Sequence, residues 1–525
     1  MDKLLTEILK YKNKIIIIMS LLFSALYYYG DVVVFNEKAF SIKYVLVFVF
    51  YFVLFKIYAF FTRKQYDEEY NFPLFDQKNL FIYFLIVFIP HVLIKYPIAL
   101  DVDAYLQLNQ TLGTDQLTTH WPLFHTLLLT YFYKYGQLLG NHNIGMFILS
   151  VIQTIFYAYI FSYVINSFYK MRFPKIFIIL SIIFYSFNPM VMASNGTTLK
   201  DANYCALLVL LCVLLIEYIY YGDNFWNNKK SLILLFLVSF LLPMFRKNGT
   251  YVVVPVLITL LFIEIFKRKK MSVKLIAFVL VCIITPSIFS NTLQTIYNAK
   301  DGSRREIFSL PFQQTARLIK YHEDLITEEE KIIINKVLDY DKVADTYMEH
   351  IADPVKYLFN NDAGAKDILD YLLVWFKQFF KAPLTYIEAT SIQNIYIVYP
   401  RINLFHYNVE CNGGFVGYEQ DKGYLQTPLW LKNNQHYYFS VLEVMHTLPV
   451  INILTNPALY VILFIFAFVL EMERKGLKKK LVFIPLLLSL LMIIAGPVII
   501  DFPRYMYPLV WTMPIYTGVL IKDFS

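Results

Sequence analysis

The sequence predicts an all-α polytopic membrane protein with about 12 transmembrane helices. Three observations predict this class: 58% of the 525 residues are hydrophobic, only 16% are charged, and apolar runs long enough to cross a bilayer recur along the chain. Lys and Arg lie in short clusters between these runs, which indicates control of membrane topology. The same placement argues against nucleic-acid binding as the reason for the net charge of +8.

Charge placement decides how the apolar runs thread the membrane. We expect spans near residues 15–34, 43–61, 79–95, 144–165, 176–192, 202–221, 231–245, 251–266, 272–292, 449–471, 481–499 and 505–521. The run Leu123–Leu139 is also long enough, but counting it would export the basic cluster at 267–270, against the positive-inside rule. We therefore expect Leu123–Leu139 to be a re-entrant or surface-lying segment, with both termini cytoplasmic in a bacterial cell membrane.

This threading divides the chain into four parts. Residues 1–78 form an N-terminal addition with two spans, and residues 79–292 form a core whose first large outer loop is 96–143. Residues 293–448 form an extracytoplasmic insertion, and residues 449–525 carry the last spans. Aromatic and aliphatic residues recur through the insertion, which predicts an α-rich folded domain. The stretch 411–423 within it is rich in Gly and Asn, which predicts a segment without regular secondary structure.

Two carboxylates in the first large outer loop are candidate catalytic groups. Asp101 and Asp103 are two positions apart, so they lie on one side of the chain if it is extended, as Pro97 favours. There they could share a metal ion or activate an acceptor. On a helix they would point about 200° apart. The alternative is a solvated loop with two ordinary acids.

Basic residues at the same predicted face are candidates for binding an anion. Arg246 and Lys247 form a basic pair that the positive-inside rule does not expect on the outer side. A phosphate or diphosphate group would explain the pair, and contact with anionic lipid is the alternative. Lys200 and Asp201 begin one span. Arg504 begins the last one and could instead form a structural pair with Asp501.

Two further features belong to this face. His120 and His125 are five positions apart, which is not a metal-binding spacing on a helix, so a structural or hydrogen-bonding role is favoured for both. Arg317, in a polar stretch after the exit of a span, could line the same cavity from above.

Taken in order, these segments resemble the GT-C superfamily of integral membrane glycosyltransferases, which use polyprenyl-phosphate-linked sugars. The resemblance rests on Asp101 and Asp103 after a span, on the re-entrant or surface segment that follows, on Lys200-Asp201 and Arg504-Tyr505 at the starts of later spans, and on a sizeable outer domain. It also rests on four short segments, and it covers most of the chain from about residue 79 onward. The segments are His120-Trp-Pro-Leu (120–123), Leu-Lys-Asp (199–201), Arg-Lys-Asn-Gly (246–249) and Gln-Gln-Thr-Ala-Arg (313–317). The chain is most similar to an uncharacterised bacterial branch of that superfamily.

The resemblance implies a transferase that moves a sugar from the lipid phosphate to a cell-envelope glycan or lipid, with inversion. Asp101 or Asp103 would be the general base, with or without a divalent metal such as Mg or Mn. The substrate-binding residues would be His120, Lys200, Asp201, Arg246, Lys247, Arg317 and Arg504. This chain has Val102 between the two acids where the family often has them adjacent, so which one acts as the base stays open. A flippase of lipid-linked saccharide, a polysaccharide polymerase or ligase, and a non-catalytic scaffold are the alternatives.

Overall fold

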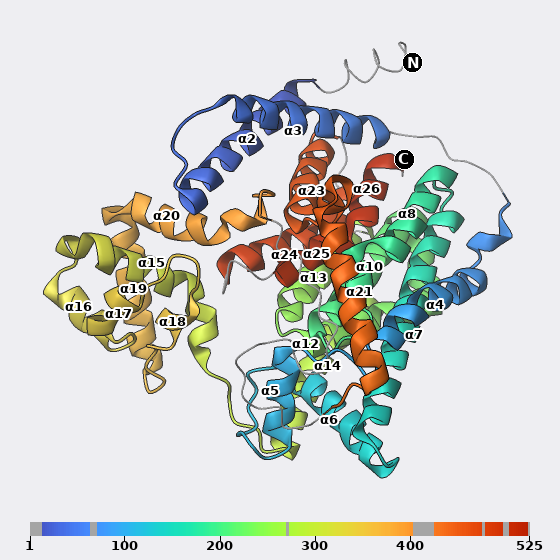
Figure 1. Cartoon of the computed structure of the whole chain (residues 1–525), viewed down its shortest axis with the longest axis horizontal. Helices are drawn as coiled ribbons and strands as arrows, with labels where there is room; N and C mark the ends of the chain where they lie inside the picture. Colours follow the sequence, from blue (N-terminus) through green and yellow to red (C-terminus); the bar gives the residue numbers. More distant parts are fainter. Residues whose placement is uncertain are drawn as a thin grey trace.

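A computed structural model describes residues 13–63, 71–268, 272–402, 425–474, 478–496 and 503–522. In this part of the chain the regular structure is helical, with isolated β-bridges and no strand (Figure 1). Seven of the described helices are long and apolar enough to cross a membrane. They are α2 (Asn13–Phe35), α3 (Ile42–Phe61), α4 (Gln77–Ile94), α7 (His142–Lys170), α10 (Lys200–Tyr221), α13 (Gly249–Arg268) and α14 (Val273–Ile296). The predicted helical membrane class is confirmed to this extent.

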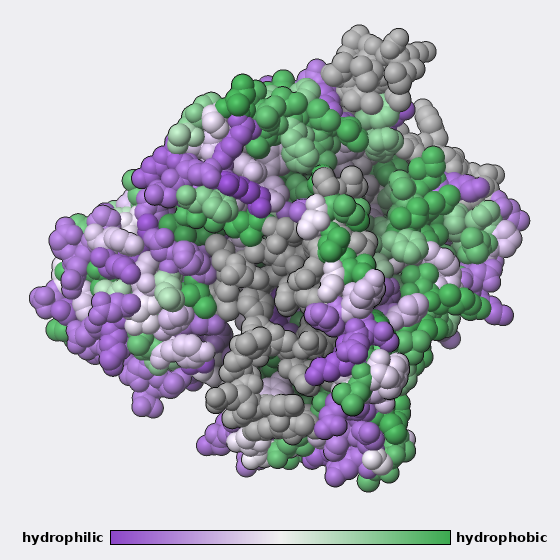
Figure 2. Space-filling view, in the orientation of Figure 1, coloured by the Kyte–Doolittle hydropathy of each residue, from purple (hydrophilic) through white to green (hydrophobic). Residues whose placement is uncertain are grey.

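Helix α10 is the centre of the apolar core. Every residue from Asp201 to Ile219 is buried, because helices α7, α12 and α25 pack around it. A helix that is apolar on all sides needs such a continuous shell of neighbours. Most helices at the periphery, such as α14, instead expose large apolar side chains. Figure 2 shows these hydrophobic residues over the part of the molecule that contains α2, α3, α4 and α8.

Several apolar segments form helices too short to cross a bilayer alone. They are α8 (Lys175–Phe187), α9 (Pro189–Ala193), α12 (Lys229–Phe245), α22 (Pro449–Leu454), α23 (Pro457–Met472), α24 (Ile484–Ala495), α25 (Tyr507–Trp511) and α26 (Met513–Ile521). The sequence predicts single helices over 449–471 and 505–521, and both are divided. Asn456 caps a new helix whose first residue is Pro457, and Pro514 lies in the first turn of α26. Proline lacks the N–H that a continuous helix needs, whereas the first turn tolerates it.

Helix α6 (Leu123–Leu138) forms a close hairpin with α7. Gly136 and Gly145 face each other where the two helices meet, and a Cβ on Gly145 would lie 1.9 Å from the Phe132 carbonyl oxygen. The short helix α5 (Val102–Thr111) packs on the other side of α6. At 16 residues, α6 is about 24 Å long. That is shorter than the hydrocarbon core of a typical bilayer, which is about 30 Å thick.

The predicted insertion contains a separate helical domain with its own core. It comprises η2 (Arg304–Phe308), α15 (Ser309–His322), α16 (Glu328–Asn335), α17 (Tyr340–Thr346), α18 (Asp353–Lys356), α19 (Ala365–Lys381) and α20 (Pro383–Asn394). Phe312, Ile334, Val343 and Tyr371 are among the buried residues of this core. Figure 2 shows hydrophilic residues over most of the visible face of the α15–α20 domain. The Gly- and Asn-rich stretch 411–423 lies outside the described residues.

Basic side chains gather at the end of α10 opposite Lys200. Lys267 pairs with Asp223, two residues after the C-terminus of α10, at 2.7 Å. Lys230 donates to the Gln77 side chain at the start of α4, at 3.0 Å. Because α10 has 22 residues, about 33 Å separate this end from Lys200. The two ends of the helix core therefore differ in character: one is basic, and the other carries the candidate site.

Candidate active site

Two loop segments lie side by side at the N-terminal end of α10. The Ala99 N–H donates to the Gly196 carbonyl at 2.8 Å, and the Thr198 N–H donates to the Ala99 carbonyl at 3.0 Å. The Asp101 N–H continues this pairing by donating to the Thr198 hydroxyl at 2.8 Å. These bonds fix the start of α5 beside the start of α10, although the two are distant in the sequence.

Asp101 and Asp103 lie at the beginning of α5. Asp101 is the N-cap residue with extended backbone angles, and its carboxylate accepts a hydrogen bond from the Asp103 N–H at 3.3 Å. Asp103 is in the first helical turn. The sequence predicts an extended segment that includes both aspartates, but the helix starts at Val102, so Asp101 is extended and Asp103 is helical. This geometry brings both carboxylates to one side, because the cap residue does not follow the helical rotation.

A single guanidinium lies between the carboxylates. The Arg504 Nη1 atom is 3.4 Å from Asp101 Oδ2, 3.2 Å from Asp103 Oδ2 and 3.9 Å from Asp201 Oδ2. Arg504 comes from η6 (Pro503–Met506), directly before α25. Lys200, the first residue of α10, also pairs with Asp103. The C-terminal segment is thus joined to the first large loop by charge-assisted contacts.

Arg246 and Lys247 point in different directions. Arg246, at the C-terminal cap of α12, pairs with Asp201 at 2.9 Å. Lys247 donates instead to the carbonyl of Thr119 in the loop that follows α5. The carboxylates of Asp101, Asp103 and Asp201 therefore face three cations, those of Lys200, Arg246 and Arg504. Lys247 instead binds the loop that follows α5.

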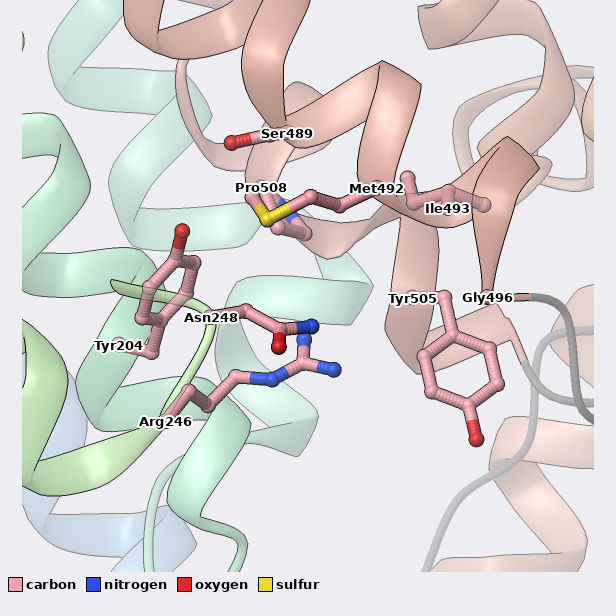
Figure 3. Close-up of a pocket in the computed structure, with 9 residues that line it drawn as sticks. All are labelled: Tyr204, Arg246, Asn248, Ser489, Met492, Ile493, Gly496, Tyr505 and Pro508. Atoms are coloured by element: carbon pink, nitrogen blue, oxygen red, sulfur yellow. The ribbon is translucent and has the colours of Figure 1, made fainter. Parts of the chain in front are cut away.

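A pocket with about 410 Å³ of empty space opens beside Arg246 (Figure 3). Its lining residues are Tyr204, Arg246, Asn248, Ser489, Met492, Ile493, Gly496, Tyr505 and Pro508. The Arg246 guanidinium lies 5.6 Å from the centre of the Tyr204 ring and 5.8 Å from that of the Tyr505 ring. Such rings favour a cation over their faces. Arg246 is the one charged group among the lining residues, and α24 contributes an apolar wall opposite it.

His120 lies at the junction between this site and the α15–α20 domain. The adjacent Thr119 N–H donates to the Lys300 carbonyl at 2.8 Å, and the Gly302 N–H donates to the Thr119 hydroxyl at 2.9 Å. Burial lowers the pKa of His120, while the carboxylates of Glu306 and Asp103 oppose this shift. His120 is therefore within electrostatic range of both parts of the protein.

The two aspartates have different acidities because their neighbours differ. Burial raises the pKa of Asp101 above its ordinary value; Arg504 counteracts this shift and the charge of Asp103 adds to it. Burial also disfavours ionised Asp103, but Lys200 and Arg504 outweigh it and hold the pKa of Asp103 well below its usual range. Environments that separate two carboxyl pKa values in this way mark distinct chemical roles.

The arrangement does not fit a divalent metal held by Asp101 and Asp103. Such an ion would need carboxylate oxygens converging on one point. The Arg504 Nη1 atom already lies near both carboxylates, 3.4 Å from Asp101 Oδ2 and 3.2 Å from Asp103 Oδ2. A metal cation there would meet direct like-charge repulsion from the guanidinium.

Arg317 is not part of this cluster. Its guanidinium pairs with Glu349 at 2.7 Å and Glu388 at 2.9 Å, both within the α15–α20 domain. It packs over the Tyr321 ring of its own helix, α15. These partners give Arg317 a structural role in the α15–α20 domain. Asp501, the alternative partner of Arg504, lies outside the described residues.

The sequence did not identify most of the pocket. Tyr204, Ser489, Met492 and Ile493 lie in apolar runs, where nothing in the pattern separates a pocket residue from a core residue. Asn248 could have been predicted from the sequence, because it follows the basic pair in the 246–249 segment. The polar and charged residues could be found, since ionisable groups at the ends of apolar runs are conspicuous.

Comparison with known proteins places the chain in one family. The matching family model is described as a family of unknown function, DUF6020, and it covers residues 36–522. All the candidate site residues lie within the matched region. No curated protein and no solved structure matches the chain. Because the match extends over most of its length, the protein belongs to the family DUF6020.

Proposed function

We propose that the protein is an inverting membrane glycosyltransferase that takes its sugar from a polyprenyl-phosphate donor. The observation that carries the proposal is a chain of ion pairs. It links Asp101, through Arg504 and Asp201, to Arg246 at the edge of a pocket with an apolar wall. A carboxylate can take the proton of an acceptor hydroxyl. Fixed cations stabilise the phosphate that leaves. An apolar pocket at the end of transmembrane helices suits a lipid that enters from the bilayer.

Asp101 is the general base in this proposal. Its raised pKa makes it a better proton acceptor than Asp103, which Lys200 and Arg504 hold in its ionised form. Asp103 positions these two cations. The acceptor, a cell-envelope glycan or lipid, attacks the anomeric carbon as Asp101 takes its proton, and the bond to the lipid phosphate breaks in the same displacement. Arg246 stabilises the charge on the departing phosphate.

The proposal includes a GT-C-like topology of about 12 spans. The basic end of α10 would be cytoplasmic under the positive-inside rule, which leaves the candidate site and the α15–α20 domain on the outer face. The five predicted spans that the seven long helices leave out would then cross as broken or tilted helices; they are 176–192, 231–245, 449–471, 481–499 and 505–521. Segment α6 would remain on the outer side, which agrees with its length and its hairpin with α7.

The pH dependence of transfer tests the choice of base. A general base must be unprotonated, so the rate should fall as the pH drops through the raised pKa of Asp101, above the range where an ordinary aspartate titrates. Asp103→Asn removes a neighbouring negative charge and should move this acid limb to lower pH. The measurement is kcat/KM for the donor across the pH range in detergent. An acid limb that stays unmoved in Asp103→Asn would contradict the assignment.

Filling the pocket tests the lipid-donor site. Met492→Trp adds volume to the apolar wall without touching an ion pair, and should raise the KM for a polyprenyl-phosphate sugar at least about tenfold. Met492→Leu conserves the volume and is the matched control. The assay measures release of polyprenyl phosphate from a panel of radiolabelled donors. Equal KM values for the two variants would place the donor elsewhere, and no turnover of any donor by the unmodified protein would count against the function.

A further inference from the structure

Four large apolar side chains form an exposed patch on the α15–α20 domain. Phe376 and Phe380 on α19 are 56% and 68% exposed, and Leu384 and Ile387 on α20 are 73% and 55% exposed. These residues are defined here as the α19–α20 patch. Large apolar side chains exposed this close together in the chain indicate a contact with another apolar body.

The two α19 residues of the patch lie on the side of that helix that faces away from the domain core. Tyr371, Val374 and Gln378 are buried on the opposite side of the helix. Phe376 and Phe380 are four residues apart, so they share one helical face, and their rings lie 5.2 Å apart. Helix α19 is thus apolar on an outward face that the core of its own domain does not cover.

The face of α20 that carries the patch is the face that meets a transmembrane helix. Leu384, Ile387 and Ser391 follow the spacing i, i+3, i+7, so they form one stripe along α20. The Ser391 hydroxyl lies 2.6 Å from the Tyr29 hydroxyl of α2. Figure 1 shows α20 passing beside the end of α2. The apolar stripe is therefore continuous with a contact to a helix that is apolar enough to cross the membrane.

The contact on α2 lies at the level expected for the bilayer interface. Tyr27, Tyr28 and Tyr29 form an aromatic triplet near the end of α2, as in the aromatic belts of membrane proteins. More than one helical turn closer to the N-terminus of α2, the side chains of Leu21 and Leu22 are 56% and 47% exposed, as lipid-facing side chains are. Ile387 and Leu384 are four and seven residues from Ser391, which is about 6 and about 10 Å along α20.

We propose that the α19–α20 patch inserts into the interfacial layer of the bilayer and holds the α15–α20 domain against the membrane. Its partner is lipid, because the stripe that carries Leu384 and Ile387 leads directly to the aromatic belt of α2. An amphipathic helix pair in this position buries its apolar side chains at the boundary between headgroups and acyl chains. The anchor fixes the domain that directly follows Lys300 and Gly302, the two residues bonded to Thr119 in the loop beside the candidate site.

Depth-dependent fluorescence quenching tests this inference without any assay of activity. The full-length protein, with its four native cysteines replaced by alanine, would carry a bimane label at Leu384→Cys or Ile387→Cys. Ile332→Cys on α16 is the matched control, because Ile332 is 61% exposed on the same domain outside the patch. Each labelled protein would be placed in nanodiscs that contain lipid with a nitroxide near the headgroup, and iodide would be the aqueous quencher.

The expected result is loss of at least about half of the fluorescence to nitroxide lipid at positions 384 and 387, and little loss at position 332, because interfacial helices bury their apolar face about 5–10 Å deep. Iodide should give the reverse order. Equal quenching of all three labels by iodide would overturn the proposal. Protection of positions 384 and 387 from both quenchers would also overturn it, because it would indicate a protein partner.

Discussion

Asp101→Asn is expected to lower the rate of sugar transfer by about 10²- to 10⁴-fold, the usual contribution of a general base. The amide keeps the shape of the side chain and can still accept the N-cap hydrogen bond from the Asp103 N–H, so the fold should be retained. The change removes only the ability to take a proton. The measurement is kcat at saturating donor, with the amount of folded protein determined by size-exclusion chromatography.

Asp103→Asn is the control for this prediction. It removes a carboxylate of similar burial from the same helix turn, but one that pairs with Lys200 and Arg504. Its effect should appear mainly as weaker donor binding, because the cations lose the group that positions them. If Asp101→Asn retained full kcat while Asp103→Asn lost it, the roles of the two aspartates would have to be exchanged.

Arg504→Ala is expected to destabilise the protein by about 3–5 kcal/mol and to abolish transfer. The guanidinium lies within 4 Å of three carboxylates, and only 18% of its side chain is exposed. Removing one partner from a buried charge cluster leaves the others uncompensated. The readout for stability is the thermal unfolding midpoint in detergent, and the readout for function is donor turnover. Arg504→Lys keeps the charge and should recover part of the stability.

A double variant separates the electrostatic cause from a packing cause. Arg504 is the one cation within 4 Å of Asp101 among the described residues. Asp101→Asn should therefore offset part of the loss caused by Arg504→Ala, and the two stability changes should not add. Simple additivity of the two changes would contradict a stabilising contact between the charges of Arg504 and Asp101.

The sequence predicted the residues of the charge cluster but not its geometry. Asp103, Lys200, Arg246 and Arg504 each lie near the end of an apolar run, and a consistent topology brings those ends to one face. Their pairing depends on the bonds between residues 99–101 and 196–198, which no periodicity encodes. The sequence also could not predict which partner each cation takes. The neighbouring residues Arg246 and Lys247 bind different partners, Asp201 and the Thr119 carbonyl.

The apolar segments show the same division between what a pattern can and cannot predict. Long uninterrupted runs such as Lys200–Tyr221 are helices as predicted, because length and hydropathy suffice. The C-terminal runs are broken at Pro457 and Pro514, because proline favours the start of a new helix in an otherwise apolar stretch. The pocket opens between α10, α24 and the start of α25, so its residues, such as Met492, carry no sign of it in the sequence.

The most direct test of the proposed function is a comparison of envelope glycans from cells that carry the unmodified protein, the Asp101→Asn variant or no protein. We expect one sugar substituent to be present in cells with the unmodified protein and lost in cells with the variant or with no protein, while the polyprenyl-phosphate sugar is still available on the outer face. Retention of the substituent with Asp101→Asn, or accumulation of lipid-linked sugar on the inner leaflet in cells without the protein, would contradict it.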